Sequence, residues 1–210
     1  MKFRLTALAL VLLATACSRE GEIGKGGVYI TRSACPQVGI PAATGDITLF
    51  NPSNRTDAAA IDVSAAITNV RSTCDETGAN IVSTATFDVV ATRRDASQAR
   101  SVVLPYFTVA MQAGTQVVAK RVGQVGLEFA AGSYRAQTSG QATIQVSRSV
   151  ATLPEDVRRE LTRERKPGDA DAAIDPLSDP KIRDAVARAT FEHLIGFQLT
   201  PEQLRYNATR

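Results

Sequence analysis

Hydrophobic and polar residues alternate in several segments between positions 28 and 150, and a period of two predicts β-strands with one buried face. The segments with this pattern are 28–35, 47–50, 61–74, 81–91 and 141–150. Turn-forming residues separate them, most clearly at Asn51–Asn54 and Asp75–Gly78. The pattern therefore predicts a series of antiparallel strands joined by short turns.

The segment Val102–Met111 is apolar at nearly every position. Strands that are buried on both faces have this composition, so we expect a central strand that is covered on both sides. Another strand is expected over Val117–Phe129, after a turn at Ala113–Thr115. About seven strands without crossover helices predict a mainly β fold, an antiparallel immunoglobulin-like β-sandwich.

The pattern changes from strand to helix at Thr152. Thr152–Glu155 has the form of a capping box and predicts a helix over 154–165, while Asp179–Pro180 predicts the start of a second helix. The first helix carries nearly balanced charges, which indicate a solvated helix with ion pairs; binding to anionic lipid or lipopolysaccharide is the alternative. We interpret residues 152–189 as a helical insertion.

Alternation returns over Phe191–Leu199, which predicts a last strand that completes a sheet. Thr200–Gln203 then has the form of a second capping box and predicts a short helical turn. The expected β-sandwich domain thus covers residues 28–207, with the insertion before its last strand.

The first residues have the composition of a secretory signal peptide. Lys2 and Arg4 precede an apolar run over Leu5–Leu13, which is too short to span a bilayer as a stable helix. The run ends at the small residues Ala14, Thr15 and Ala16, and Cys17 follows them. This order predicts a signal peptide over residues 1–16.

The four residues Ala14–Cys17 resemble the lipobox of bacterial lipoproteins, with Ala14 where that family usually has Leu. The resemblance implies lipidation of Cys17 and a membrane anchor of several acyl chains. The segment Ser18–Gly27 is polar and rich in glycine, which predicts a flexible tether between this anchor and the domain. Ser18 after the cysteine implies, for Gram-negative lipoproteins, the periplasmic face of the outer membrane. The alternative is ordinary cleavage after Ala16, which leaves a soluble protein.

Two cysteines remain if Cys17 carries lipid. Cys35 and Cys74 are an even pair in an oxidising compartment, so we expect a disulfide bond between them. A metal site or a reactive thiol is the alternative, although His193 is distant in sequence and does not complete the spacing of a zinc site. We therefore expect no metal and no cofactor.

The charge of the chain argues against nucleic acid as a partner. The formal net charge is +3, and it falls to about +1 when Lys2 and Arg4 leave with the signal peptide. Binding to phosphates requires a concentrated basic surface, which this balance does not provide. Tryptophan is absent, which makes an aromatic carbohydrate groove a poor expectation.

Candidate catalytic residues are few. His193 is the only histidine, and its place on an apolar strand face predicts a hydrogen-bonded core residue instead of a general base. Four aspartates lie close together in the sequence, at Asp169, Asp171, Asp175 and Asp179. They lack the spacing of an EF-hand loop, so they predict a flexible acidic loop. We therefore expect a protein that is not an enzyme.

A second resemblance covers most of the chain after the signal peptide. The blocks Ala34–Pro36, Leu104–Phe107 and Ile195–Asn207 resemble those of small envelope lipoproteins of proteobacteria. The resemblance implies a shared fold and location, and it implies no activity.

Two hypotheses of function follow. The first is a lipid-anchored module for protein interaction or envelope assembly, because exposed edge strands accept a partner strand. The second is a periplasmic carrier or sensor that holds a small apolar ligand between its sheets. A tightly filled core would favour the first hypothesis, and an internal pocket of roughly a few hundred Å³ would favour the second.

Overall fold

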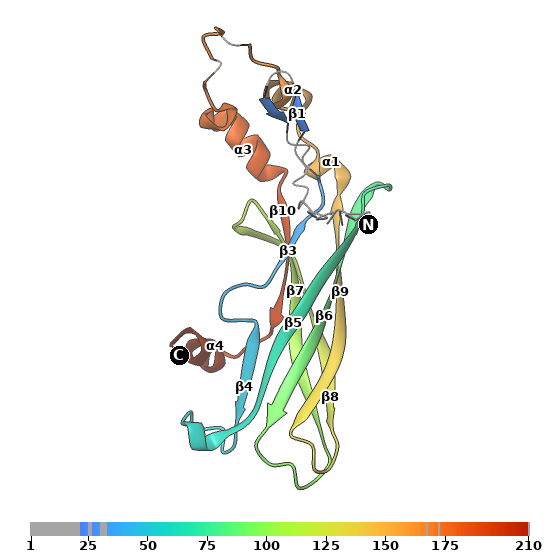
Figure 1. Ribbon diagram of the computed structural model, residues 1–210, viewed down its shortest axis with the longest axis vertical. Coiled ribbons are helices and arrows are strands. Elements are labelled where there is room, and N and C mark those ends of the chain that lie inside the picture. The colour runs from blue at the N-terminus through green and yellow to red at the C-terminus, as the bar shows by residue number, and fades with distance from the viewer. Residues whose placement is uncertain (1–21, 25–26, 30–32, 167, 172, 210) are drawn as a thin grey trace, which may run out of the picture.

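The computed structural model describes residues 22–24, 27–29, 33–166, 168–171 and 173–209. The fold is mainly β, with two four-stranded sheets, one of them a curled half-barrel (Figure 1). The β6 sheet has the strand order β4 (Asp46–Phe50), β5 (Ile61–Asp75), β6 (Asn80–Arg93) and β9 (Arg135–Ser147). The β10 sheet has the order β3 (Gln37–Gly39), β10 (Phe191–Phe197), β7 (Arg100–Gln112) and β8 (Gln116–Phe129).

Alternating burial confirms most of the predicted strands. In β6, every second side chain from Ile81 to Arg93 is buried, and the residues between them are exposed or half-buried. In β10, Phe191, His193, Ile195 and Phe197 face the interior and are almost completely buried. The period of two in the sequence therefore identifies the inner face of both sheets.

Side chains from both sheets fill the space between them. Phe87, Leu127, Phe129 and Phe197 are at most 2 % exposed. The rings of Phe87 and Tyr106 pack edge to face with their centroids 5.2 Å apart. Burial of each such side chain contributes about 1.5–3 kcal/mol, so this interior is the main source of stability.

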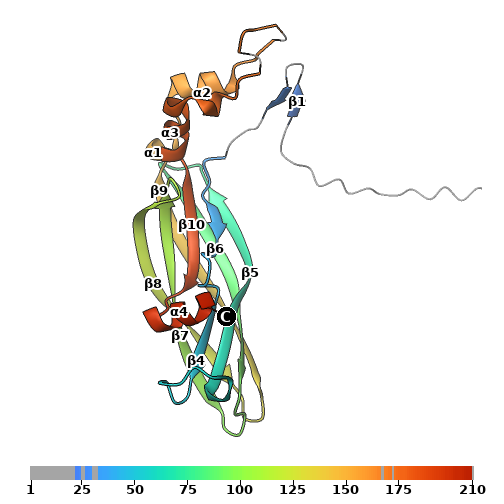
Figure 2. The same ribbon diagram turned by 90° about the vertical axis from the view of Figure 1, so that its left-hand side faces the viewer.

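Short helices lie between β9 and β10 and confirm the predicted helical insertion. They are α1 (Arg148–Ala151), α2 (Glu155–Thr162), the 3₁₀ turn η2 (Pro176–Ser178) and α3 (Pro180–Arg188). Val157, Ile182 and Ala185 form a small apolar cluster of their own. Both views show α2 and α3 at one end of the elongated sandwich (Figures 1 and 2).

Two helix starts have the caps that the sequence predicts. The carboxylate of Asp179 accepts a hydrogen bond from the backbone N–H of Lys181, 2.8 Å away, at the start of α3. The backbone N–H of Gln203 donates to the hydroxyl of Thr200 over 3.2 Å, and the N–H of Thr200 donates to the Gln203 side chain over 2.9 Å. This reciprocal pair opens α4 (Pro201–Thr209).

The immunoglobulin-like, fully antiparallel arrangement is not what the strand order shows. β4, β5 and β6 are successive strands of one sheet, whereas an immunoglobulin domain crosses to its other sheet after its second strand. In addition, β3 pairs in parallel with β10. This pairing joins residues near the two ends of the domain, and local alternation carries no information about such a contact.

Two local predictions are wrong. Of the predicted first strand over 28–35, residues 28–29 belong to a separate hairpin of β1 (Glu22–Gly24) and β2 (Gly27–Tyr29), and 33–35 are not in a strand. Among the described residues, the first strand of the sandwich is β3. The predicted capping box at Thr152 does not form, because the Thr152 hydroxyl donates to the carbonyl of Arg148 and ends α1. The remaining short element, the 3₁₀ turn η1 (Ala58–Ala60), precedes β5.

The outer face of β7 is more open than the sequence predicts. Val103 is 57 % exposed and Phe107 is half-buried, although both belong to the run that was expected to be covered on both sides. The run is apolar because β7 is an inner strand of its sheet, but no second layer covers Val103. Among the described helices, even the longest, α3 and α4 with nine residues each, are too short to cross a membrane.

Candidate functional site

The single histidine of the chain bridges the two sheets. His193 on β10 is 0 % exposed; its Nδ1 lies 3.0 Å from the hydroxyl of Ser83 on β6, and its Nε2 lies 2.9 Å from the hydroxyl of Thr108 on β7. A neutral imidazole donates from one nitrogen and accepts at the other, so these two hydroxyls satisfy it. The prediction of a hydrogen-bonded core histidine is confirmed.

Burial lowers the pKa of His193 to about 4, so the side chain is neutral at pH 7. A serine beside a histidine is also the pair that nucleophilic catalysis uses. Here, however, Ser83 is 1 % exposed, and a substrate has no access to its hydroxyl. The arrangement links the two layers and does not present a reactive group to solvent.

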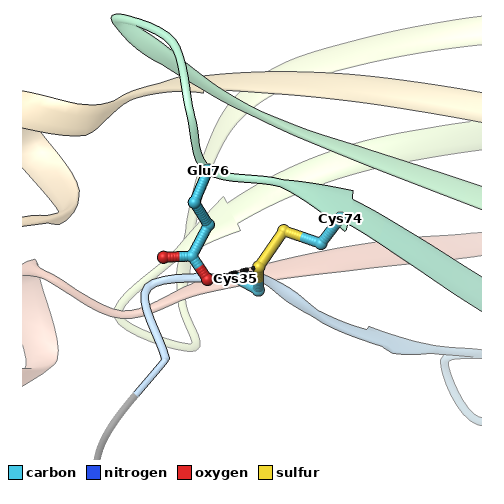
Figure 3. Close-up of side chains that lie close together, drawn as sticks. All are labelled: Cys35, Cys74 and Glu76. Atoms are coloured by element: carbon cyan, nitrogen blue, oxygen red, sulfur yellow. Dashed lines mark hydrogen bonds between the residues drawn. A yellow bond between two sulfur atoms is a disulfide. The ribbon is translucent and has the colours of Figure 1, made fainter.

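Cys35 and Cys74 form the predicted disulfide bond, with their Cα atoms 6.1 Å apart. Cys35 lies just before β3, and Cys74 lies near the end of β5, so the bond joins a strand of the β10 sheet to one of the β6 sheet. Figure 3 shows the side chain of Glu76 turned toward this bond. Oε1 of Glu76 lies 2.8 Å from Sγ of Cys35 and accepts a hydrogen bond from the Ser33 hydroxyl over 2.7 Å.

The surroundings of the Cys35–Cys74 bond are typical of a structural disulfide. Reactive cysteines lie in electropositive surroundings that favour the thiolate, whereas the nearest charged group at this bond is the Glu76 carboxylate. Cys35, Cys74 and Glu76 are also the one group of three potential metal ligands among the described residues. Because the disulfide bond occupies both sulfur atoms, Cys35 and Cys74 offer no thiolate to a metal while they are oxidised.

The acidic residues between α2 and α3 have local partners. These are the backbone N–H of Lys166 for Asp169, the side chain of Arg163 for Asp171, the N–H of Leu177 for Asp175 and the N–H of Lys181 for Asp179. The hydrogen bond from Arg163 holds the pKa of the Asp171 carboxyl below its usual value. These contacts cap helices and pair charges, and they do not converge on one point.

The first half of β8 is the most exposed strand segment of the sandwich. All seven residues from Gln116 to Val122 are exposed, on both faces of the strand, and β8 is the last strand of its sheet. Val117 is 54 % exposed and Val122 is 58 % exposed. Further along, Val125, Leu127 and Phe129 are buried. The strand therefore leaves the core and presents a free edge.

A shallow groove of about 620 Å³ lies on the outer face of the β6 sheet. Its lining includes the outward-facing residues Thr48, Ser64, Ala66, Val90, Thr92 and Gln137, with Asp46 and Arg135 as the charged members. These outward-facing residues place the opening of the groove on the surface of the sheet, whereas the carrier hypothesis places its ligand between the sheets.

The sequence indicates Cys35, Cys74 and His193 as candidates, and the structure brings them close together: Cys74 on β5 stands opposite Ser83 on β6, whose hydroxyl contacts His193. Cys17 and the predicted signal peptide lie outside the described residues. The exposed half of β8 was missed as a candidate site. The signal for it is the absence of acidic residues between Asp95 and Glu128, a stretch that contains Lys120 and Arg121.

Comparison of the chain with family models, with curated proteins and with solved structures finds no match. The candidate functional site is therefore identified from the geometry of this structure alone.

Proposed function

We propose that this protein is a lipid-anchored, non-enzymatic component of a bacterial envelope, which binds another envelope protein through a free sheet edge. The observation that carries the proposal is the exposed first half of β8, from Gln116 to Val122. Exposed edge strands present unpaired backbone N–H and C=O groups, which an extended segment of a second protein is able to pair with.

The anchor is proposed from the sequence. Ala14–Cys17 supports acylation of Cys17, and the small hairpin of β1 and β2 lies between this cysteine and the sandwich. Several acyl chains at about 0.8 kcal/mol for each buried CH₂ group make a durable anchor. The proposed location is the periplasmic face of the outer membrane, which Ser18 supports.

The side chains inside the sandwich favour a binding function over catalysis. Among the described residues, the only imidazole and its hydroxyl partners are buried, and two cysteines are paired with each other. The space between the sheets is filled by side chains such as Ile195 and Leu127, which are 0 % exposed. A filled interior favours the interaction module over the carrier of an apolar ligand.

Intact mass spectrometry of the protein purified from bacterial membranes tests the anchor. We expect a mature mass that begins at Cys17 and includes three acyl chains, with the acyl mass lost in a Cys17→Ser variant. A mass that begins at Cys17 without lipid would overturn the anchor and leave a soluble periplasmic protein.

A further inference from the structure

We propose that the exposed half of β8 binds an extended, acidic segment of a partner protein as an added strand. This inference rests on the proposed function and names the chemistry of the partner. It combines two observations: the strand edge is free, and the positive charge of its side chains is not balanced by carboxylates.

The edge is open because β8 is the last strand of its sheet and, among the described strands, pairs with β7 alone. At Gly123 the ring of Tyr106 passes over β8, and its hydroxyl donates to the carbonyl of Gln141 on β9 over 2.9 Å. From there toward the turn at Ala113–Thr115, the residues Gln116–Val122 are exposed on both faces. An added strand would therefore find both the backbone edge and its flanking side chains accessible.

The exposed half of β8 is positively charged and contains no acidic residue. Residues 96–154, which contain β7, β8 and β9, have one acidic residue and five basic residues, of which Arg100 is paired with Asp62 at the opposite end of β7. Two of the five basic residues, Lys120 and Arg121, lie on the exposed half of β8. Among the described residues, neither forms an ion pair with a carboxylate.

The side chains specify the partner further. Lys120 and Arg121 are neighbours in a strand, so they point to opposite faces of the sheet. Lys120 lies on the outer face, 5.3 Å from the centre of the Phe107 ring. A partner strand with acidic residues on each face would pair with both cations, and β-branched residues would pack beside Val118 and Val122.

Two other occupants fit less well. A second copy of β8 would bring two Lys120 and two Arg121 side chains to one edge, where like charges destabilise cross-strand pairing. An anionic membrane is recognised by several cations gathered on one surface, whereas here one cation lies on each face of a strand. On the outer face, Lys120 lies between Val118 and Val122, and this order of apolar and basic side chains favours an acidic polypeptide.

Site-specific photo-cross-linking of the full chain in bacterial membranes tests the inference. Benzoylphenylalanine replaces Val118 on the β8 edge, and in a second strain it replaces Leu177, which is exposed in the helical insertion. We expect the Val118 position to cross-link a protein segment that contains acidic and β-branched residues. The double variant Lys120→Glu/Arg121→Glu should reduce this adduct about tenfold, because two attractive pairs become repulsive.

A matched control carries the same change of charge elsewhere. Arg158→Glu/Arg159→Glu reverses two adjacent exposed arginines on α2 and should leave the Val118 adduct unchanged. Adducts with lipid alone, with a second copy or with a segment lacking acidic residues would overturn the inference. An equal effect of both double variants would overturn it as well. If Leu177 captures a protein and Val118 does not, only this inference fails; if neither does, the proposed interaction function fails too.

Discussion

His193 makes the stability of the sandwich depend on pH. Its pKa is about 4 in the folded protein, because burial disfavours the charged imidazolium, and about 6.5 in the unfolded chain. Between these values the unfolded chain takes up a proton that the folded protein does not. The free energy of unfolding therefore falls as the pH decreases from 6.5 toward 4, by about 2 kcal/mol between pH 7 and pH 5.

Urea unfolding of wild type and His193→Gln at pH 7, 6 and 5 measures this contribution. The variant should be less stable at pH 7, because it disturbs the buried hydrogen bonds to Ser83 and Thr108. Its stability should change less over the same pH range, since the titrating group is gone. Equal pH dependence of the two proteins would show that His193 is not the group responsible.

Gly140 is a second residue on which packing depends. A Cβ atom at this position would lie 2.4 Å from Cζ of Phe87, which stands opposite it in the β6–β9 pairing. Phe87 is 2 % exposed and has no room to move away. We expect Gly140→Ala to lower the free energy of unfolding by about 1–3 kcal/mol, measured by urea denaturation.

Gly126 on β8 provides the control for this substitution. No atom lies within 4 Å of the position of its Cβ, so Gly126→Ala should change stability by less than about 0.5 kcal/mol. A similar loss in both variants would mean that backbone conformation, and not the Phe87 ring, sets the cost.

At the scale of elements, the disulfide bond ties the segment before β3 to the end of β5. The two cysteines are 39 positions apart, and closing a loop of this length stabilises the fold by about 4 kcal/mol in the chain-entropy model. The double variant Cys35→Ala/Cys74→Ala should lose a stability of this size in urea denaturation. Wild-type protein treated with a reductant should unfold at the same urea midpoint as the double variant. An unchanged midpoint after reduction would contradict a structural role of the disulfide bond.

Elements whose signals are local could be predicted from the sequence. The period of two locates β5, β6, β9 and β10, and capping residues such as Asp179 and Thr200 locate two helix starts because their hydrogen bonds span two or three positions. The pairing of β3 with β10 could not be predicted, since it depends on contacts between distant segments.

The burial or exposure of single residues that depends on distant contacts could not be predicted from the sequence either. Arg93 is 5 % exposed at the end of β6, and its guanidinium donates to the carbonyls of Gln98, Ala130 and Ser133. Nothing in the sequence around Arg93 indicates that its charged side chain is buried. The same holds for the exposed half of β8, whose exposure depends on the position of this strand at the edge of its sheet.

At the scale of the whole molecule, the sandwich and the helical insertion have separate apolar clusters. Val157 and Ile182 pack with Ala185, while Ala151 and Phe191, which lie on either side of the insertion, belong to one cluster of the sandwich. Because both ends of the insertion start from the same cluster, a short linker is able to join them. The sandwich should therefore fold without α2 and α3.

Replacement of residues 153–188 by a Gly/Ser linker of about six residues tests this separation, since such a linker spans up to roughly 20 Å. We expect the variant to keep the Cys35–Cys74 bond and a free energy of unfolding within about 1 kcal/mol of wild type, because the interior near His193 is unchanged. It should also keep the cross-link from Val118, since β8 belongs to the sandwich. Failure to fold would show that the insertion supports the core. Loss of the cross-link alone would place part of the binding surface on the helices.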